Sequence, residues 1–177
     1  VGYNALSTED AHGRNVAIGR RALFALDAGQ NANNVAIGWF SGQAVTTGTQ
    51  NILIGSEAGD ALTEGSSNVA IGHAALSTED AHGANVAIGY EALNLQDAGT
   101  NAYNIAIGYT AGASVTTGGQ NTLIGGLAGD ALTSGAGNVA VGYLALSAED
   151  AHGRNVAVGH GALFVQNAGA DAYSVAV

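Results

Sequence analysis

Apolar and small residues alternate along this chain in short groups that recur at regular intervals. The group Asn-Val-Ala-Ile-Gly, or a close variant, returns at a spacing of 17 or 19. Its copies begin at Asn15, Asn34, Asn51, Asn68, Asn85, Asn104, Asn121, Asn138 and Asn155, and Ser174 begins a truncated tenth copy. Alternation with a period of two indicates a β-strand, with Val and Ile on one face and Ala on the other. We expect Val and Ile to fill the interior and Ala to face outward.

The repeats are themselves grouped. The spacings 19, 17, 17 and 17 add up to a 70-residue super-repeat, and the chain holds about two and a half of these. The fourth residue after the repeat Gly is Leu in some copies and Gly in others, and the two types alternate in pairs. In the Gly type we expect a second short strand, as at residues 44–46 and 61–63.

Seventeen residues are too few for a helical hairpin repeat, which needs about 33–34 residues. They fit one coil of an all-β, parallel β-solenoid (a β-roll), with tight turns and one step along the axis per coil. The pattern predicts about ten coils of the 17-residue or 19-residue type, and we interpret residues 1–177 as one repetitive segment of a longer fibre. A left-handed hexapeptide helix, as in acyltransferases, is a lesser alternative, because only one hexad per coil fits.

Stacked coils place equivalent residues above one another, roughly 4.8 Å apart. The repeat Asn residues then form a column in which side-chain amides can hydrogen-bond along the axis. We assign these nine Asn residues, from Asn15 to Asn155, to a structural ladder. The repeat Gly supplies backbone angles that other residues avoid.

The amino-acid composition argues against several classes of function. The formal net charge is −10 and there is no Cys or Pro. An acidic chain does not favour nucleic acid, whose phosphates bind basic surfaces. A disulfide scaffold needs Cys, and no apolar run reaches the ~18 residues of a membrane span. We expect no nucleic acid, no membrane insertion and no cofactor.

One turn combines residues that elsewhere carry chemistry. Ser-Thr-Glu-Asp-Ala-His-Gly occupies residues 7–13 and 77–83, and a variant occupies 147–153. One short turn offers no pocket or oxyanion site, so we assign no catalytic residue and expect no enzyme. His12, His82 and His152 lie four coils apart, about 19 Å at the β spacing. They cannot share an ion within one chain, although three copies of one His around a threefold axis could, and we assign no metal site.

The two extra residues of each 19-residue coil lie at 27–34, 97–104 and 167–174. Insertions in solenoids form loops, often on a binding face. One loop position carries Asn33, Tyr103 or Tyr173, and Trp39 or Tyr109 follows the next strand. We select Asn33, Trp39, Tyr103, Tyr109 and Tyr173 as candidate ligand-binding residues, because aromatic rings beside Asn and Asp can stack on sugars. The alternative is a bulge that only accommodates the super-repeat.

The Asn-Val-Ala-Ile-Gly-x-x-Ala repeats resemble the head repeats of trimeric autotransporter adhesins. They are equally similar to repeats of phage tail fibres and of surface proteins that end in an endosialidase-type chaperone domain, as residues 46–55 illustrate. The resemblance implies a parallel β-roll, left-handed in the adhesin heads, with three chains around a threefold axis. It also implies a location outside the cell, on a cell surface or a virion.

We therefore expect a non-enzymatic structural segment of an extracellular fibre, a tail-fibre or adhesin shaft or head. Its role would be rigid spacing and multivalent display, with self-association as a homotrimer or fibre. The alternative is a carbohydrate-binding adhesive module that recognises surface glycans through the insertion loops. A left-handed hexapeptide acyltransferase is the lesser alternative.

Overall fold

The structure is a computed structural model that describes residues 1–9, 13–79, 81–148, 151–166, 170–171 and 173–177. All its regular elements are short strands, as the sequence predicts. They are β1 (Val16–Ile18), β2 (Val35–Ile37), β3 (Ile52–Ile54), β4 (Val69–Ile71), β5 (Val86–Ile88), β6 (Ile105–Ile107), β7 (Thr122–Ile124), β8 (Val139–Val141), β9 (Val156–Val158) and β10 (Val175–Ala176). The all-β, parallel solenoid class is confirmed.

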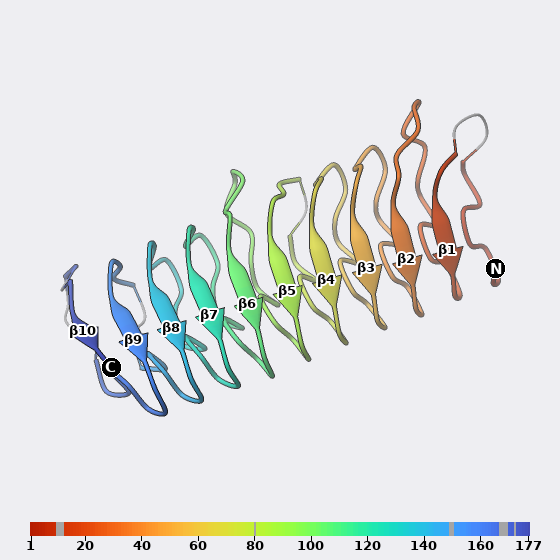
Figure 1. Cartoon of the computed structure of the whole chain (residues 1–177). Helices are drawn as coiled ribbons and strands as arrows, with labels where there is room; N and C mark the ends of the chain where they lie inside the picture. Colours follow the sequence, from red (N-terminus) through yellow and green to blue (C-terminus); the bar gives the residue numbers. More distant parts are fainter. Residues whose placement is uncertain (10–12, 80, 149–150, 167–169, 172) are drawn as a thin grey trace.

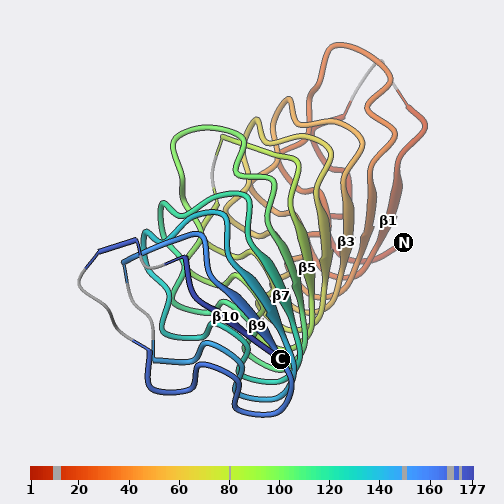
Figure 2. The ribbon, with the colours of Figure 1, turned by 60° about the vertical axis from the view of Figure 1, so that its left-hand side comes forward.

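The ten strands form one parallel sheet in chain order, β1 to β10. Equivalent residues pair in register, so that Val69 lies beside Val86 and Ile71 beside Ile88. Each strand contacts only the strand before it and the strand after it, and the termini lie at opposite ends of the stack (Figure 1). The architecture is therefore nearly one-dimensional, as in other repeat proteins. The stack also twists from end to end (Figure 2).

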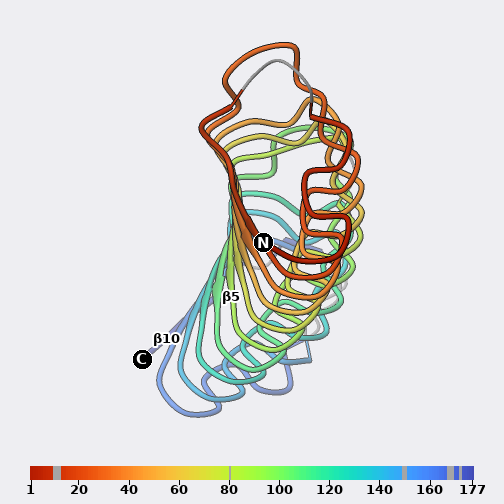
Figure 3. The same cartoon turned by 90° about the vertical axis from the view of Figure 1, so that its right-hand side faces the viewer.

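The orientation of the strand faces is the reverse of our expectation. The central residue of each strand from β2 to β9, such as Ala70 or Ala87, is completely buried. The flanking Val and Ile residues are half-buried or exposed, as Ile18 shows at 45 % exposure. The coil is flattened, with strands along one side and turns close behind (Figure 3). The interior therefore holds Ala, or Leu in β3 and β7, at the central strand position, and the β-branched residues face outward.

Our prediction of a second short strand in the Gly-type coils is also wrong. Residues 44–46 and 61–63 form turns and bends, and each described coil contains one strand. The backbone of these turns still bonds from coil to coil, as in the N–H of Thr46 to the carbonyl of Thr63 at 2.8 Å. A hexapeptide helix would carry three hexads per coil, so the single strand does not match that alternative.

The Gly that follows each strand is required by the stacking. Gly72 has φ +138°, and a Cβ added there would overlap with the carbonyl oxygen of Gly89 in the next coil. No real Cβ tolerates such an approach to backbone. The Gly column therefore permits both the positive backbone angle and the close approach of consecutive coils.

The 70-residue super-repeat has a packing explanation. Most strands place Ala in the interior, whereas β3 and β7 place Leu53 and Leu123 there. A Cβ at Gly42 would lie 2.6 Å from the Leu53 side chain, and one at Gly59 would lie 2.8 Å from it. The paired Gly residues thus make room for one large core residue. One cycle of large and small residues takes four coils.

Candidate functional site

The repeat Asn residues form a continuous hydrogen-bonded ladder inside the solenoid. From Asn34 to Asn155 they are fully or almost fully buried. The Oδ1 atom of each accepts the backbone N–H of the equivalent residue in the next coil, as Asn51 accepts from Asn68 at 2.9 Å. This bond repeats from Asn15 through to Ser174. The ladder holds the entry to every strand in register.

The other side-chain atom, Nδ2, distinguishes two types of coil. In the 17-residue coils it donates to the carbonyl fourteen residues later, as from Asn51 to Gly65 at 2.7 Å. In the 19-residue coil that begins at Asn85, Nδ2 is buried and has no hydrogen-bond partner among the described residues. At Asn15 the same atom donates to the carboxylate of Glu9 in the preceding turn, at 3.2 Å. The insertion thus breaks one of the two bonds of the ladder.

An aromatic column runs along the coil edge at which the strands end. The rings of His73 and Tyr90 stack with centroids 5.2 Å apart, and those of Tyr90 and Tyr109 with centroids 5.3 Å apart. Both faces of Tyr90 are therefore occupied by neighbouring rings. Gly126 occupies the next position of the column, and among the described residues no ring stacks on the outer face of Tyr109, which is 60 % exposed.

The structure does not bring the five candidate ligand-binding residues into one site. Tyr103 lies two residues before β6 and Tyr109 directly follows its repeat Gly, so the two rings flank opposite ends of the strand. Asn33 and Trp39 flank β2 in the same way. The chain projects in a loop before β2 and before β6 (Figure 1), and the residues of the aromatic column instead follow the ends of the strands. Any sugar contact through them involves two separate edges.

These residues also have partners of their own. Trp39 stacks on Phe40 with centroids 3.9 Å apart. The Tyr173 hydroxyl accepts a hydrogen bond from Arg154 at 2.6 Å, and the amide of Asn33 donates to the carbonyl of Asn31 at 3.3 Å. All five side chains are exposed at the surface. They could contact a ligand there, or they could simply cover the turns of the solenoid.

The insertion loop fastens the acidic turn of the preceding coil. The backbone N–H of Gly83 donates to the side-chain oxygen of Asn101 at 3.0 Å. The same bond joins Gly13 to Asn31 and Gly153 to Asp171. The two extra residues therefore form an anchored loop, rather than a free one.

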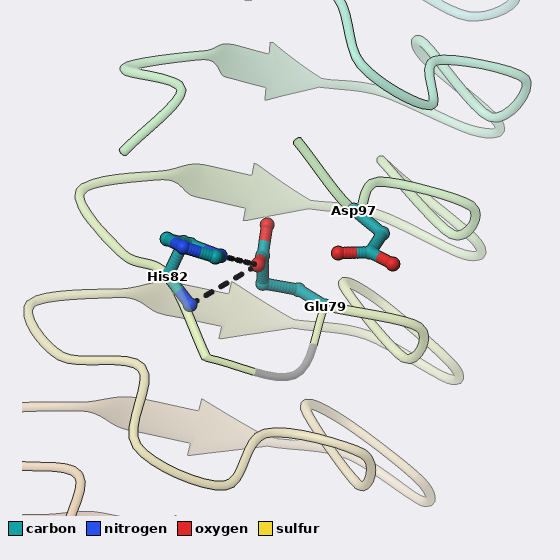
Figure 4. A group of neighbouring side chains, drawn as sticks. All are labelled: Glu79, His82 and Asp97. Carbon is teal, nitrogen blue, oxygen red and sulfur yellow. Dashed lines mark hydrogen bonds and ion pairs between the residues drawn. The ribbon is translucent and has the colours of Figure 1, made fainter. Parts of the chain in front are cut away.

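The acidic turn brings three potential ligands together. Glu79 is fully buried, and its carboxylate accepts the backbone N–H of His82 at 3.2 Å. The imidazole Nδ1 of His82 lies 3.5 Å from the same carboxylate oxygen. Asp97, from the next coil, faces the pair, and one ligand atom from each of the three residues lies within 4.8 Å of the others (Figure 4).

Sequence reasoning missed Asp97 as a neighbour of the turn. Asp97 follows Glu79 by 18 residues, about one coil. Searching for ligand types one coil length apart would have found it. In the first super-repeat Glu9 and Asp27 occupy the same positions, while His12 lies outside the described residues. In the third, Asn167 stands in place of Asp, and it and Glu149 lie outside the described residues as well.

No protein-family model, curated protein or solved structure matches the chain. Within the described part of the chain, no helix is long and apolar enough to cross a membrane. The geometry defines the class of protein, a parallel β-solenoid of tandem repeats. Its function has to be argued from the stack and its surfaces.

Proposed function

We propose that this chain is a rigid, non-enzymatic segment of an extracellular fibre, which spaces and displays other parts of that fibre. The observation that supports this is the uninterrupted Asn ladder from Asn15 to Ser174. Every coil bonds to the next through the same backbone and side-chain groups. Such a stack extends in one direction by adding repeats, without changing its cross-section.

The outward strand face supports self-association. The strands β1 to β10 contain no charged residue, although the chain has a net charge of −10. Their outward side chains form two half-buried or exposed columns, which consist of Val and Ile except for Thr122 in β7. A second copy of the chain presents the same columns at the same spacing, so the faces can pack in register along their length. We propose a homo-oligomer, with a trimer as the preferred form, through this face rather than through the buried Ala column.

The association is tested by one substitution on each face of strand β4. Ile71→Glu places a charge on the outward face, and we expect it to lower the oligomer mass while the circular dichroism stays that of a β protein. The matched control is Leu95→Glu, because Leu95 is 46 % exposed in the turns. Ala70→Glu buries an unpaired charge and should unfold the chain. An unchanged mass for Ile71→Glu in multi-angle light scattering would remove the strand face from the interface.

The spacer role is tested by deleting residues 15–84, one complete super-repeat. The join keeps every column in register, so the product should fold and shorten by roughly 19 Å, four steps of about 4.8 Å. Electron microscopy or small-angle scattering measures the length. Deletion of only ten residues is the control, and it should cause misfolding because it moves the strands out of register. A folded product of unchanged length would contradict a linear spacer.

Carbohydrate binding is the second candidate function, and Tyr109 favours it, because it is 60 % exposed and no described ring stacks on its outer face. A sugar ring can stack on this exposed face, beside the polar groups of the same edge. A glycan array compares the whole chain, the Tyr109→Ala variant and the Tyr90→Ala variant. Binding that requires Tyr109 would favour an adhesive module, whereas no binding by the whole chain would leave the spacer role as the better account.

A further inference from the structure

The cluster of Glu79, His82 and Asp97 combines ligands from two consecutive coils. Glu79 and His82 belong to the acidic turn that precedes β5, and Asp97 belongs to the insertion loop that follows it. One oxygen from each carboxylate and one imidazole nitrogen lie within 4.8 Å of one another (Figure 4). Residues from two coils thus present three ligand atoms to one small volume.

A second observation points to a ligand at this cluster. The Nδ1 atom of His82 is buried and has no hydrogen-bond partner among the described residues. It lies on the side of the imidazole that faces the Glu79 carboxylate, at 3.5 Å from one oxygen. In the neutral tautomer with its proton on Nε2, this nitrogen presents its lone pair to the cluster, which is the form that binds a metal ion.

The local charge favours a cation. The carboxylates of Glu79 and Asp97 lie close to each other, and Glu79 is completely buried. Burying a carboxylate is costly unless a positive group compensates for it. A bound cation would add to the charge compensation of this carboxylate, which His82 already faces.

We infer that Glu79, His82 and Asp97 bind a divalent first-row transition ion, with Zn²⁺ as the representative. A neutral imidazole with carboxylate oxygens suits Zn²⁺, whereas Mg²⁺ and Ca²⁺ favour oxygen ligands alone. Tetrahedral Zn²⁺ with bonds of about 2.0–2.1 Å brings its ligand atoms to roughly 3.4 Å from one another. Asp97 is exposed, so its side chain is free to close that distance. Water completes the fourth position.

The ion fastens two coils at a place where the ladder is weakened. Asn85 lacks the Nδ2 bond that the 17-residue coils make, and the cluster bridges the turn before Asn85 to the loop after it. Because an ion that binds the folded state alone stabilises it by mass action, this junction becomes more stable when Zn²⁺ is present. The inference does not depend on the proposed fibre function.

The experiment measures metal binding directly. The chain is stripped with a chelator, titrated with Zn²⁺ by calorimetry, and titrated with Co²⁺ while its visible absorption is recorded. The same titrations are made with His82→Gln, Asp97→Asn and the control His73→Gln, whose ring lies in the exposed aromatic column. We expect His82→Gln to bind one ion fewer per chain than the unmodified protein, and His73→Gln to bind the same number.

Asp97→Asn should weaken the binding of this ion by about 10- to 100-fold or more, since even the loss of an outer-shell partner costs that much. The test compares the number of ions bound by each variant with the number bound by the unmodified chain. Any ion bound by the first or third super-repeat is present in both and cancels. Equal stoichiometry and affinity for the unmodified chain and His82→Gln, or no binding by the unmodified chain, would overturn the inference.

Thermal unfolding separates a metal site from a structural ion pair. Zn²⁺ should raise the unfolding temperature of the unmodified chain and of His73→Gln, and should leave that of His82→Gln unchanged relative to its own metal-free form. If His82→Gln only removed an ion pair, it would unfold at a lower temperature without metal and still gain the same shift from Zn²⁺. That result would also overturn the inference.

Discussion

The 17-residue coil that begins at Asn51 and the 19-residue coil that begins at Asn85 differ in one bond of the ladder. Asn51 uses both ends of its amide, accepting from Asn68 and donating to Gly65. Asn85 still accepts the backbone N–H of Asn104 at 3.1 Å, but its Nδ2 has no partner among the described residues. With its two extra residues, this coil brings no described carbonyl within hydrogen-bond distance of the Asn85 Nδ2 atom.

The difference explains the residues that surround the insertion. In the regular coils the position fourteen residues after Asn is often Gly, as at Gly65, where a Cβ would overlap with the carbonyl oxygen of His82. Where the following coil carries the insertion, that position holds His82 or His152. We attribute this to the departure of the inserted loop from the regular stack, which leaves space for a side chain. The turn that precedes each of these insertions thus carries a His at a position where the regular coils carry Gly.

Substitutions in the ladder should cause the largest losses of stability, and the loss should differ between the two coils. Asn51→Ala orphans the N–H of Asn68 and the carbonyl of Gly65, at about 1–3 kcal/mol for each buried group, so we expect a loss of about 4 kcal/mol. Asn85→Ala orphans only the N–H of Asn104, so we expect about 2 kcal/mol. Urea unfolding followed by far-ultraviolet circular dichroism measures both. Equal losses would mean that the Nδ2 bond contributes nothing.

Substitutions of the glycine residues of the two coils should cause smaller losses of stability than those of the ladder. Gly65→Ala forces a Cβ against a backbone carbonyl, and overpacking of this kind costs about 3 kcal/mol. Gly99 has φ +67° and nothing within 4 Å of an added Cβ, so Gly99→Ala should cost only the left-handed backbone, about 1 kcal/mol. Thermal unfolding of the two variants measures the order. A larger cost at Gly99 would contradict the looser packing of the insertion loop.

The smallest expected effect concerns Asp60, which lies nine residues after Asn51. Desolvation by burial raises the pKa of Asp60, and the neighbouring Glu57 raises it further. The folded state therefore holds the proton more tightly than the unfolded state, and stability increases as the pH falls through the folded pKa. The equivalent residue of the longer coil is Asn94, which donates to Ser77 at 2.8 Å.

Asp60→Asn should therefore stabilise the chain slightly at neutral pH, by about 0.5 kcal/mol or less. The gain should vanish in acid, where Asp60 is protonated in both states. Unfolding measured across this pH range checks the sign, and Glu64→Gln on an exposed turn is the control. A loss of stability at neutral pH would show that the charged form of Asp60 is stabilised.

The local pattern of the chain predicts much of the fold. The regular recurrence of Asn, the short apolar group and Gly predicts the parallel solenoid, the strand positions and the Asn column. These follow from periodicity because identical positions must stack. The insertion loops are also visible, since two extra residues cannot continue a regular coil.

The sequence did not determine which face of each strand points inward. An alternation of Val, Ala and Ile is compatible with either orientation, and hydrophobicity alone favours the larger residues inside. The tertiary structure decides the matter: Ala70 and its equivalents, with Leu in β3 and β7, are buried against the turns, while Val and Ile face outward. The prediction of a second strand is wrong because the chain returns to the next strand through a series of tight turns.

For the candidate sites too, the sequence and the tertiary structure each determined a different part. The sequence alone supplied the types of residue, the acidic turn with its His and the aromatic rings near the insertions. Only the tertiary structure placed Tyr103 and Tyr109 at opposite ends of β6 and brought Asp97 against Glu79 and His82. Contacts between coils depend on stacking across a whole turn of the solenoid, and stacking is a property of the folded chain rather than of any local segment.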